Sequence, residues 1–91
     1  MMMRPIPNDA DSITVALQAL AVSLGDEARA SRLLSLTGLS VDDLRHRAAE
    51  PEVLVAVLRF LEDHEPDLLA VADALGMKPQ ELVAARIALD A

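Results

Sequence analysis

The stretch from Pro51 to His64, PEVLVAVLRFLEDH, constrains the fold more than any other part of this sequence, because apolar residues surround most of a helix there. One apolar stripe has the helical spacing i, i+3, i+4 and i+7: Leu54, Val57, Leu58 and Leu61. Further apolar residues widen that stripe beyond half of the helix surface: Val53, Val55, Ala56 and Phe60. A helix that is apolar on most sides is buried. The sequence therefore predicts a central helix over residues 51–64 against which the rest of the chain packs.

Composition limits what can surround this helix. The chain has 91 residues, enough for one small domain, and its 53% apolar residues include a single aromatic, Phe60, which favours closely packed helices. Since cysteine is absent, disulfides, thiolate nucleophiles and zinc–thiolate sites are excluded. A net charge of −7 argues against general affinity for nucleic-acid phosphates or anionic membranes. Most of the acidic residues, however, stand where helices are expected to begin, so capping explains the charge at least as well as a cationic partner does.

Helix start and stop signals follow one another closely along the chain. They predict five further helices, over about residues 9–24, 26–37, 40–49, 65–75 and 79–89. Glycine is expected to end three of these helices, at Gly25, Gly38 and Gly76. Residues 1–8, MMMRPIPN, lack periodicity and are predicted to form a flexible arm. The predicted fold is all-α, a compact bundle of about six short helices in a single domain over residues 9–91.

An internal sequence similarity suggests two three-helix units, residues 9–49 and 50–91, around the central helix. The segment TGLSVDDL from Thr37 to Leu44 resembles LGMKPQEL from Leu75 to Leu82, at an offset of 38 residues. The alternative is convergence, because any helix–glycine–helix hairpin uses similar residues.

Four arginines surround the Gly38 turn and are candidates for a small anion-binding or partner-binding face: Arg29, Arg32, Arg45 and Arg47. In the helix before that turn, Arg29 and Arg32 are expected to point outward while Leu33, Leu34 and Leu36 face the core. The alternative is that the arginines pair with the acidic residues of the same unit, Asp26, Glu27, Asp42 and Asp43.

The segment from Ala74 to Leu89 resembles a helix-turn-helix. The alternative function is therefore a nucleic-acid-binding protein that uses Arg29, Arg32, Arg45 and Arg47. The second helix of the segment offers Lys78, Gln80 and Arg86 as donors against Glu81 and Asp90, which is poor for contacting phosphates and bases. A structural hairpin is favoured, and nucleic acid is an improbable partner.

No residue pattern predicts catalysis, a metal site or a cofactor. The run Glu62, Asp63, His64, Glu65 holds metal-ligand types, but consecutive side chains diverge around a helix end. His46 has no serine, cysteine or second histidine at a meaningful spacing. We therefore do not expect an enzyme.

The remaining hypothesis is a protein-interaction or accessory module. Both Ile13–Leu24 and Leu82–Leu89 are apolar on more than one side, so the first or last helix is expected to expose an apolar patch for a protein partner or a second copy. A compact monomer is the alternative. The apolar stretch from Ile13 covers only about twelve residues, well short of the roughly 20 that cross a bilayer, so no membrane span is expected and the cytoplasm is the default location.

Three segments together resemble a known family: LLSLTGLSVDDLR, PEVLVAVLRFLEDHE and LGMKPQELVAARIAL, within residues 13–89. The order of these motifs is similar to small alphaproteobacterial proteins grouped as domain of unknown function 3572. The resemblance implies an all-helical, cytoplasmic bacterial protein and brings no activity or functional residues with it.

Overall fold

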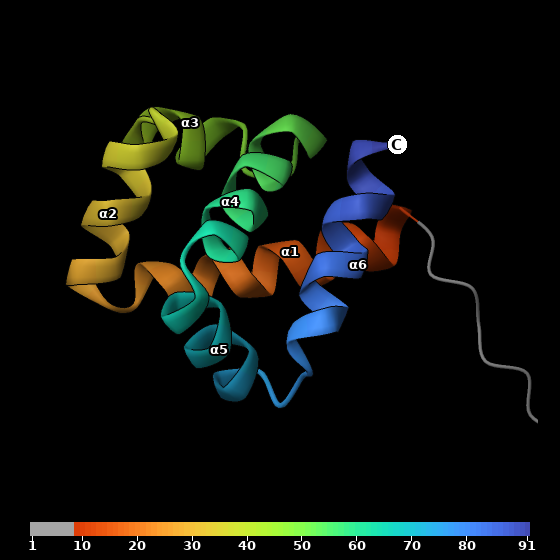
Figure 1. The fold of residues 1–91 in the computed structure, drawn as a ribbon. Coiled ribbons are helices and arrows are strands. Elements are labelled where there is room, and N and C mark those ends of the chain that lie inside the picture. Colours follow the sequence, from red (N-terminus) through yellow and green to blue (C-terminus); the bar gives the residue numbers. More distant parts are fainter. Residues whose placement is uncertain (1–8) are drawn as a thin grey trace, which may run out of the picture.

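The computed structural model describes residues 9–91, and the predicted arm over residues 1–8 lies outside this range. The described chain forms six helices and no strand, which confirms the all-α prediction (Figure 1). Their bounds are α1 Asp9–Leu24, α2 Glu27–Thr37, α3 Val41–His46, α4 Pro51–Asp63, α5 Glu65–Ala74 and α6 Pro79–Asp90.

The central position of α4 is confirmed. Helices α1, α2, α5 and α6 all contact it, and Figure 1 shows α2 and α6 on either side of α4, with α1 running across them. Six side chains of α4 are buried: Val53, Leu54, Val57, Leu58, Phe60 and Leu61. Val55 and Ala56 are only half-buried, so one side of α4 stays partly open.

Local capping chemistry sets the helix ends. The Asp26 carboxylate accepts the Arg29 backbone N–H at 2.9 Å at the start of α2. Gly38 and Gly76 follow α2 and α5 with φ of 76° and 65°, a conformation that glycine adopts without steric strain. Gly25 directly follows α1, as expected, but its φ is not positive. A tight turn ends α1 instead, in which the Gly25 N–H donates to the Val22 carbonyl at 3.1 Å.

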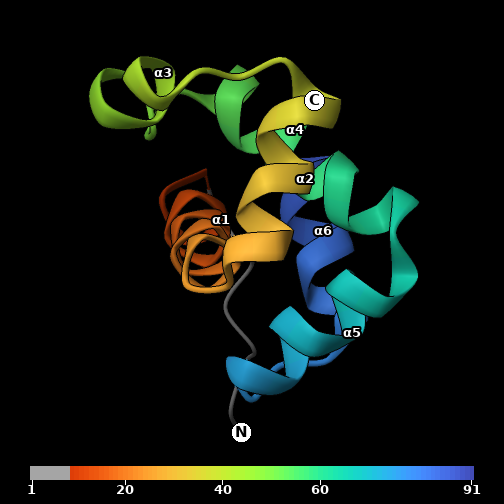
Figure 2. The same cartoon turned by 90° about the vertical axis from the view of Figure 1, so that its left-hand side faces the viewer.

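The predicted offset of 38 residues recurs in the helix boundaries. Helices α2 and α5 begin at Glu27 and Glu65, and α3 and α6 begin at Val41 and Pro79. Packing differs between the two units, because α6 has 12 residues and buries Leu82 and Ala85, whereas α3 has 6 residues and buries none. Figure 2 shows α3 projecting to one side of α2 and α4. A true duplication stays a prediction.

Two expectations about α2 and α3 were wrong. Leu36 was expected in the core, yet it is 61% exposed, because it lies in the last turn of α2 and borders a hollow that the described chain leaves unfilled. The third helix was expected to continue to about Ala49. It ends at His46, because the backbone turns there and the Glu50 N–H donates to the Arg47 carbonyl.

Candidate functional site

Arg29 and Arg32, two of the four arginines predicted to form an anion-binding face, bind one carboxylate inside the protein. Arg29 Nε and Arg32 Nη2 donate to Asp67 Oδ1 at 2.9 and 2.7 Å. The Asp67 side chain is 8% exposed and that of Arg29 is 15% exposed, whereas Arg32 keeps 47%. The expectation that Arg29 points outward was wrong, because α5 places a buried carboxylate against this side of α2.

Two opposing effects act on the pKa of the Asp67 carboxyl. Burial by itself raises the pKa, since it penalises the charged form. The hydrogen bonds and positive charges of Arg32 and Arg29 outweigh burial and hold the pKa of Asp67 below its ordinary value. The carboxylate is therefore charged near neutral pH, and the three side chains tie α2 to α5.

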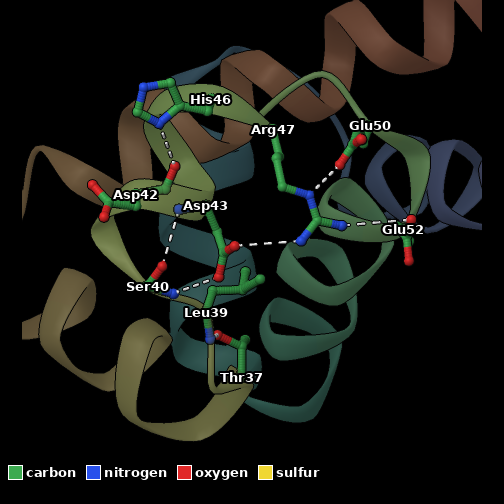
Figure 3. A network of polar contacts seen from close by, with 9 residues as sticks. All are labelled: Thr37, Leu39, Ser40, Asp42, Asp43, His46, Arg47, Glu50 and Glu52. Carbon is green, nitrogen blue, oxygen red and sulfur yellow. Dashed lines mark hydrogen bonds and ion pairs between the residues drawn. The ribbon is translucent and has the colours of Figure 1, made fainter.

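Arg47, the third predicted arginine, belongs to an ion-pair network around α3 (Figure 3). Its guanidinium contacts the carboxylates of Asp43, Glu50 and Glu52. Asp43 also closes a capping box at the start of α3, because it accepts the Ser40 backbone N–H at 2.9 Å while its own N–H donates to Ser40 Oγ at 3.0 Å. The hydrogen bond from the Ser40 backbone is the main reason that the pKa of Asp43 lies below its usual range.

Arg45, the fourth arginine, is exposed and has no ion-pair partner among the side chains of residues 11–91. Next to it, His46 Nδ1 lies 3.2 Å from the Asp42 carbonyl oxygen (Figure 3). The four arginines thus divide into a pair bound to α5, a third bound around α3 and a fourth in solvent. Three of the four arginines therefore form internal ion pairs, which was the alternative stated from the sequence. Of their four partner carboxylates, only Asp43 was among the acidic residues suggested there; the others are Glu50, Glu52 and Asp67.

A depression of mixed polar and apolar character lies between the end of α2 and the open side of α4. We call it the α2/α4 hollow, and it is lined by Leu36, Thr37, Ala56, Arg59, Phe60, Asp63 and His64, with a volume of about 150 Å³. The His64 ring packs on Phe60 with centroids 4.7 Å apart. His64 Nδ1 lies 2.7 Å from the Phe60 carbonyl oxygen and must donate there, because a carbonyl oxygen only accepts.

A second, polar hollow adjoins it on the other side of α4. Arg59, Glu62, Asp63 and Arg86 line this α4/α6 hollow of about 180 Å³, so Arg59 and Asp63 border both depressions. Arg86 forms a two-point contact with Glu62, with Nε to Oε2 at 2.8 Å and Nη2 to Oε1 at 3.1 Å, and Glu62 raises the pKa of Arg86. Arg59 pairs with Asp90 at the end of α6.

These contacts bear on the helix-turn-helix resemblance. The α5–α6 turn has the expected form, with the Met77 N–H donating to the Ala72 carbonyl at 2.9 Å after Gly76. Arg86, however, is bound to α4, and the exposed polar residues at the start of α6 are Gln80 and Glu81, with Lys78 just before the helix. Few donors on α6 remain free to contact nucleic acid.

No group of three or more histidine, aspartate or glutamate side chains in the described part of the chain could hold a metal ion. None of the helices over residues 9–91 combines the length and apolar character that a membrane crossing requires.

Sequence reasoning missed the α2/α4 hollow and the Asp67 contact. Both depend on how α2 docks against α4 and α5, which local patterns do not encode. Ala56, a small residue between the larger side chains of α4, is the one sequence signal for the hollow.

Comparison with known proteins completes the description of the chain. No curated protein sequence matches it, and no solved structure does. The family described as "Protein of unknown function (DUF3572)" matches residues 9–91, which spans all six helices. The chain therefore belongs to the DUF3572 family.

Proposed function

We propose that this protein is a non-enzymatic protein-interaction module that contacts its partner through the α2/α4 hollow. The observation that carries the proposal is the exposure of Leu36, which leaves 61% of its surface in water at the edge of a hollow floored by Ala56 and Phe60. Exposed apolar surface at a concave site is typical of contact surfaces, because covering it is favourable.

The size of the hollow favours a protein partner over a small molecule. Sites that enclose small ligands typically measure roughly 300–1,000 Å³. The hollow of about 150 Å³ is smaller and suits one inserted side chain. A single anchoring side chain in a pocket is a common feature of protein interfaces.

Charge supports a protein partner over nucleic acid. Five arginines are held in ion pairs within the described chain: Arg29, Arg32, Arg47, Arg59 and Arg86. Binding of phosphates would require several of these pairs to break, in a chain whose net charge is −7. We therefore prefer a protein partner to duplex DNA, and we propose the cytoplasm as its location.

The proposed surface differs from the one expected on the first or last helix. Helix α1 exposes one large apolar side chain in its described part, Leu24, and α6 exposes one, Ile87. At the hollow, by contrast, the exposed Leu36 lies next to two further apolar lining residues, Ala56 and Phe60.

Site-specific photocrosslinking in the native cell tests the proposal. A benzophenone amino acid replaces Leu36 in one variant and Leu69 in a control. Leu69 is a suitable control because it is 47% exposed on α5, outside the hollow. We expect a discrete protein adduct from position 36 and none of the same mass from position 69. Identical products from both positions, or no adduct at position 36, would contradict the proposal.

A further inference from the structure

We propose that the segment entering the α2/α4 hollow is a basic peptide that presents one large apolar side chain next to a lysine or arginine. This inference rests on the proposed function and adds the chemistry of the partner. The chemistry of the partner follows from two observations at the hollow. Polar side chains there already have hydrogen-bond partners, and one charged side chain, Asp63, has no ion-pair partner among the described side chains.

The walls of the hollow offer few free hydrogen-bonding groups. The Thr37 hydroxyl donates to the Leu33 carbonyl at 2.6 Å. It also accepts the Leu39 N–H at 3.1 Å (Figure 3). His64 Nδ1 is bound to the Phe60 carbonyl. With these groups engaged, the apolar side chains of Leu36, Ala56 and Phe60 remain to contact an inserted side chain, so an aliphatic or aromatic one fits there better than a polar one does.

The rim of the hollow carries an uncompensated negative charge. Two charged residues line it, Arg59 and Asp63. Arg59 is paired with Asp90 of α6, whereas the Asp63 carboxylate has no ion-pair or hydrogen-bond partner within residues 11–91, whose side chains the structure describes. Glu65, two residues on, is also exposed and unpaired within that range. A cationic side chain beside the inserted apolar one would therefore meet Asp63 without displacing an existing pair.

The whole chain reinforces this local charge. Its net charge is −7, and only Arg45 and Lys78 lack an ion-pair partner among the lysines and arginines of the described residues. Long-range attraction thus favours the approach of a basic segment. A second copy of the chain is disfavoured at this surface, because it would bring one Asp63 rim against another.

Selection from a library of random 12-residue peptides displayed on phage tests the inference with the full-length protein. Peptides that bind wild type are counter-selected on Leu36→Gln, which removes the apolar edge at an exposed position and so leaves the core intact. We expect the surviving peptides to combine net positive charge with a large apolar residue.

Affinity measurements on a selected peptide separate the two contributions. Leu36→Gln is expected to weaken binding about tenfold or more, since it removes apolar contact area at the anchor. Asp63→Asn is expected to weaken binding about two- to fivefold, chiefly by slowing association, and to reduce the dependence on salt, as for a charge at an interface rim. Leu69→Gln and Asp73→Asn change the same residue types on exposed parts of α5 and should leave the affinity unchanged.

The outcomes are distinguishable. Neutral or acidic peptides that depend on Leu36 but not on Asp63 would overturn the basic partner and leave the proposed function standing. Failure to select any peptide that depends on Leu36 would overturn both. Light scattering that shows a dimer lost in Leu36→Gln would identify a second copy as the occupant and would also refute the basic peptide.

Discussion

The contact of Arg29 and Arg32 with Asp67 gives the sharpest prediction about stability, because it joins α2 to α5 through a nearly buried carboxylate. Asp67→Ala removes the acceptor and leaves the guanidinium of Arg29 in place, with its side chain only 15% exposed. Arg32 keeps 47% of its side-chain surface exposed and can turn into solvent. The cost of the substitution therefore arises mainly at Arg29.

The size of the effect follows from this difference in exposure. Removing one partner of a fully buried ion pair costs about 3–5 kcal/mol, because the other charge is left uncompensated, whereas exposed pairs contribute about 0–1 kcal/mol. The pair with Arg29 lies nearer the buried case and the pair with Arg32 nearer the exposed one. We expect Asp67→Ala to lower the free energy of unfolding by about 2–3 kcal/mol. A loss of 2 kcal/mol would lower the Tm of a domain of this size by about 8–16 °C.

Chemical denaturation followed by circular dichroism at pH 7 measures this loss. Asp73→Ala is the matched control, because Asp73 is exposed on the same helix and has no side-chain partner in the described chain. We expect its effect to stay within about 0.5 kcal/mol. Equal values for the two variants would refute the assignment of Asp67 as a stabilising link between α2 and α5.

The pH dependence supplies a second readout of the same prediction. Folding lowers the pKa of Asp67 below its unfolded value of about 3.9, so the folded state favours the ionised carboxyl. The resulting stability is present above about pH 4 and is lost as the pH falls through the folded pKa. Wild type and Asp67→Ala should therefore differ most near neutral pH and converge in acid. A constant difference down to pH 2 would contradict this explanation.

Three further predictions concern the core and the helix ends. Leu58→Ala should destabilise the protein by about 2–5 kcal/mol, because Leu58 is fully buried in α4, whereas Leu69→Ala on the exposed part of α5 should cost less than about 1 kcal/mol; thermal unfolding distinguishes them. Gly38→Ala should lower the free energy of unfolding by about 1–2 kcal/mol because of the positive φ alone, since an added Cβ meets no atom within 4 Å. Gly38→Asn should lower it less, and equal losses for the two variants would contradict this reason. Ser40→Ala should cost about 1 kcal/mol by removing the N-cap of α3, and hydrogen exchange should show the loss in α3 before α4; uniform loss would contradict local capping.

Prediction from sequence succeeded where the physical cause is local. The caps at Asp26 and Ser40, and the glycines after α2 and α5, act within one helical turn, so the sequence was sufficient to place those helix ends. The burial of α4 was also predictable, because apolar residues surround most of it.

Prediction failed where the environment comes from another helix. Arg29 was expected to lie in solvent, yet Asp67, 38 residues away in the chain, draws it inward. Leu36 was expected in the core because it is apolar. Its apolar character does not reveal that the part of α4 beside it carries the small residue Ala56. For Arg29 and Leu36 the deciding neighbour belongs to a different element, and pairing between elements is not encoded in the spacing of residues along one helix.

Ala56 offers a way to separate a binding surface from a packing defect. If the α2/α4 hollow were only imperfect packing, filling it would improve stability and change nothing else. Ala56→Leu adds three carbons within a hollow of about 150 Å³ and should stabilise the fold by about 0.5–2 kcal/mol, the usual gain from filling a cavity. Ala84→Leu, on the exposed side of α6, controls for the change in residue type. As a binding surface, the hollow should lose the Leu36-dependent adduct in Ala56→Leu and keep it in Ala84→Leu. An Ala56→Leu protein that is more stable and still forms the adduct would show that the hollow is not where the partner binds.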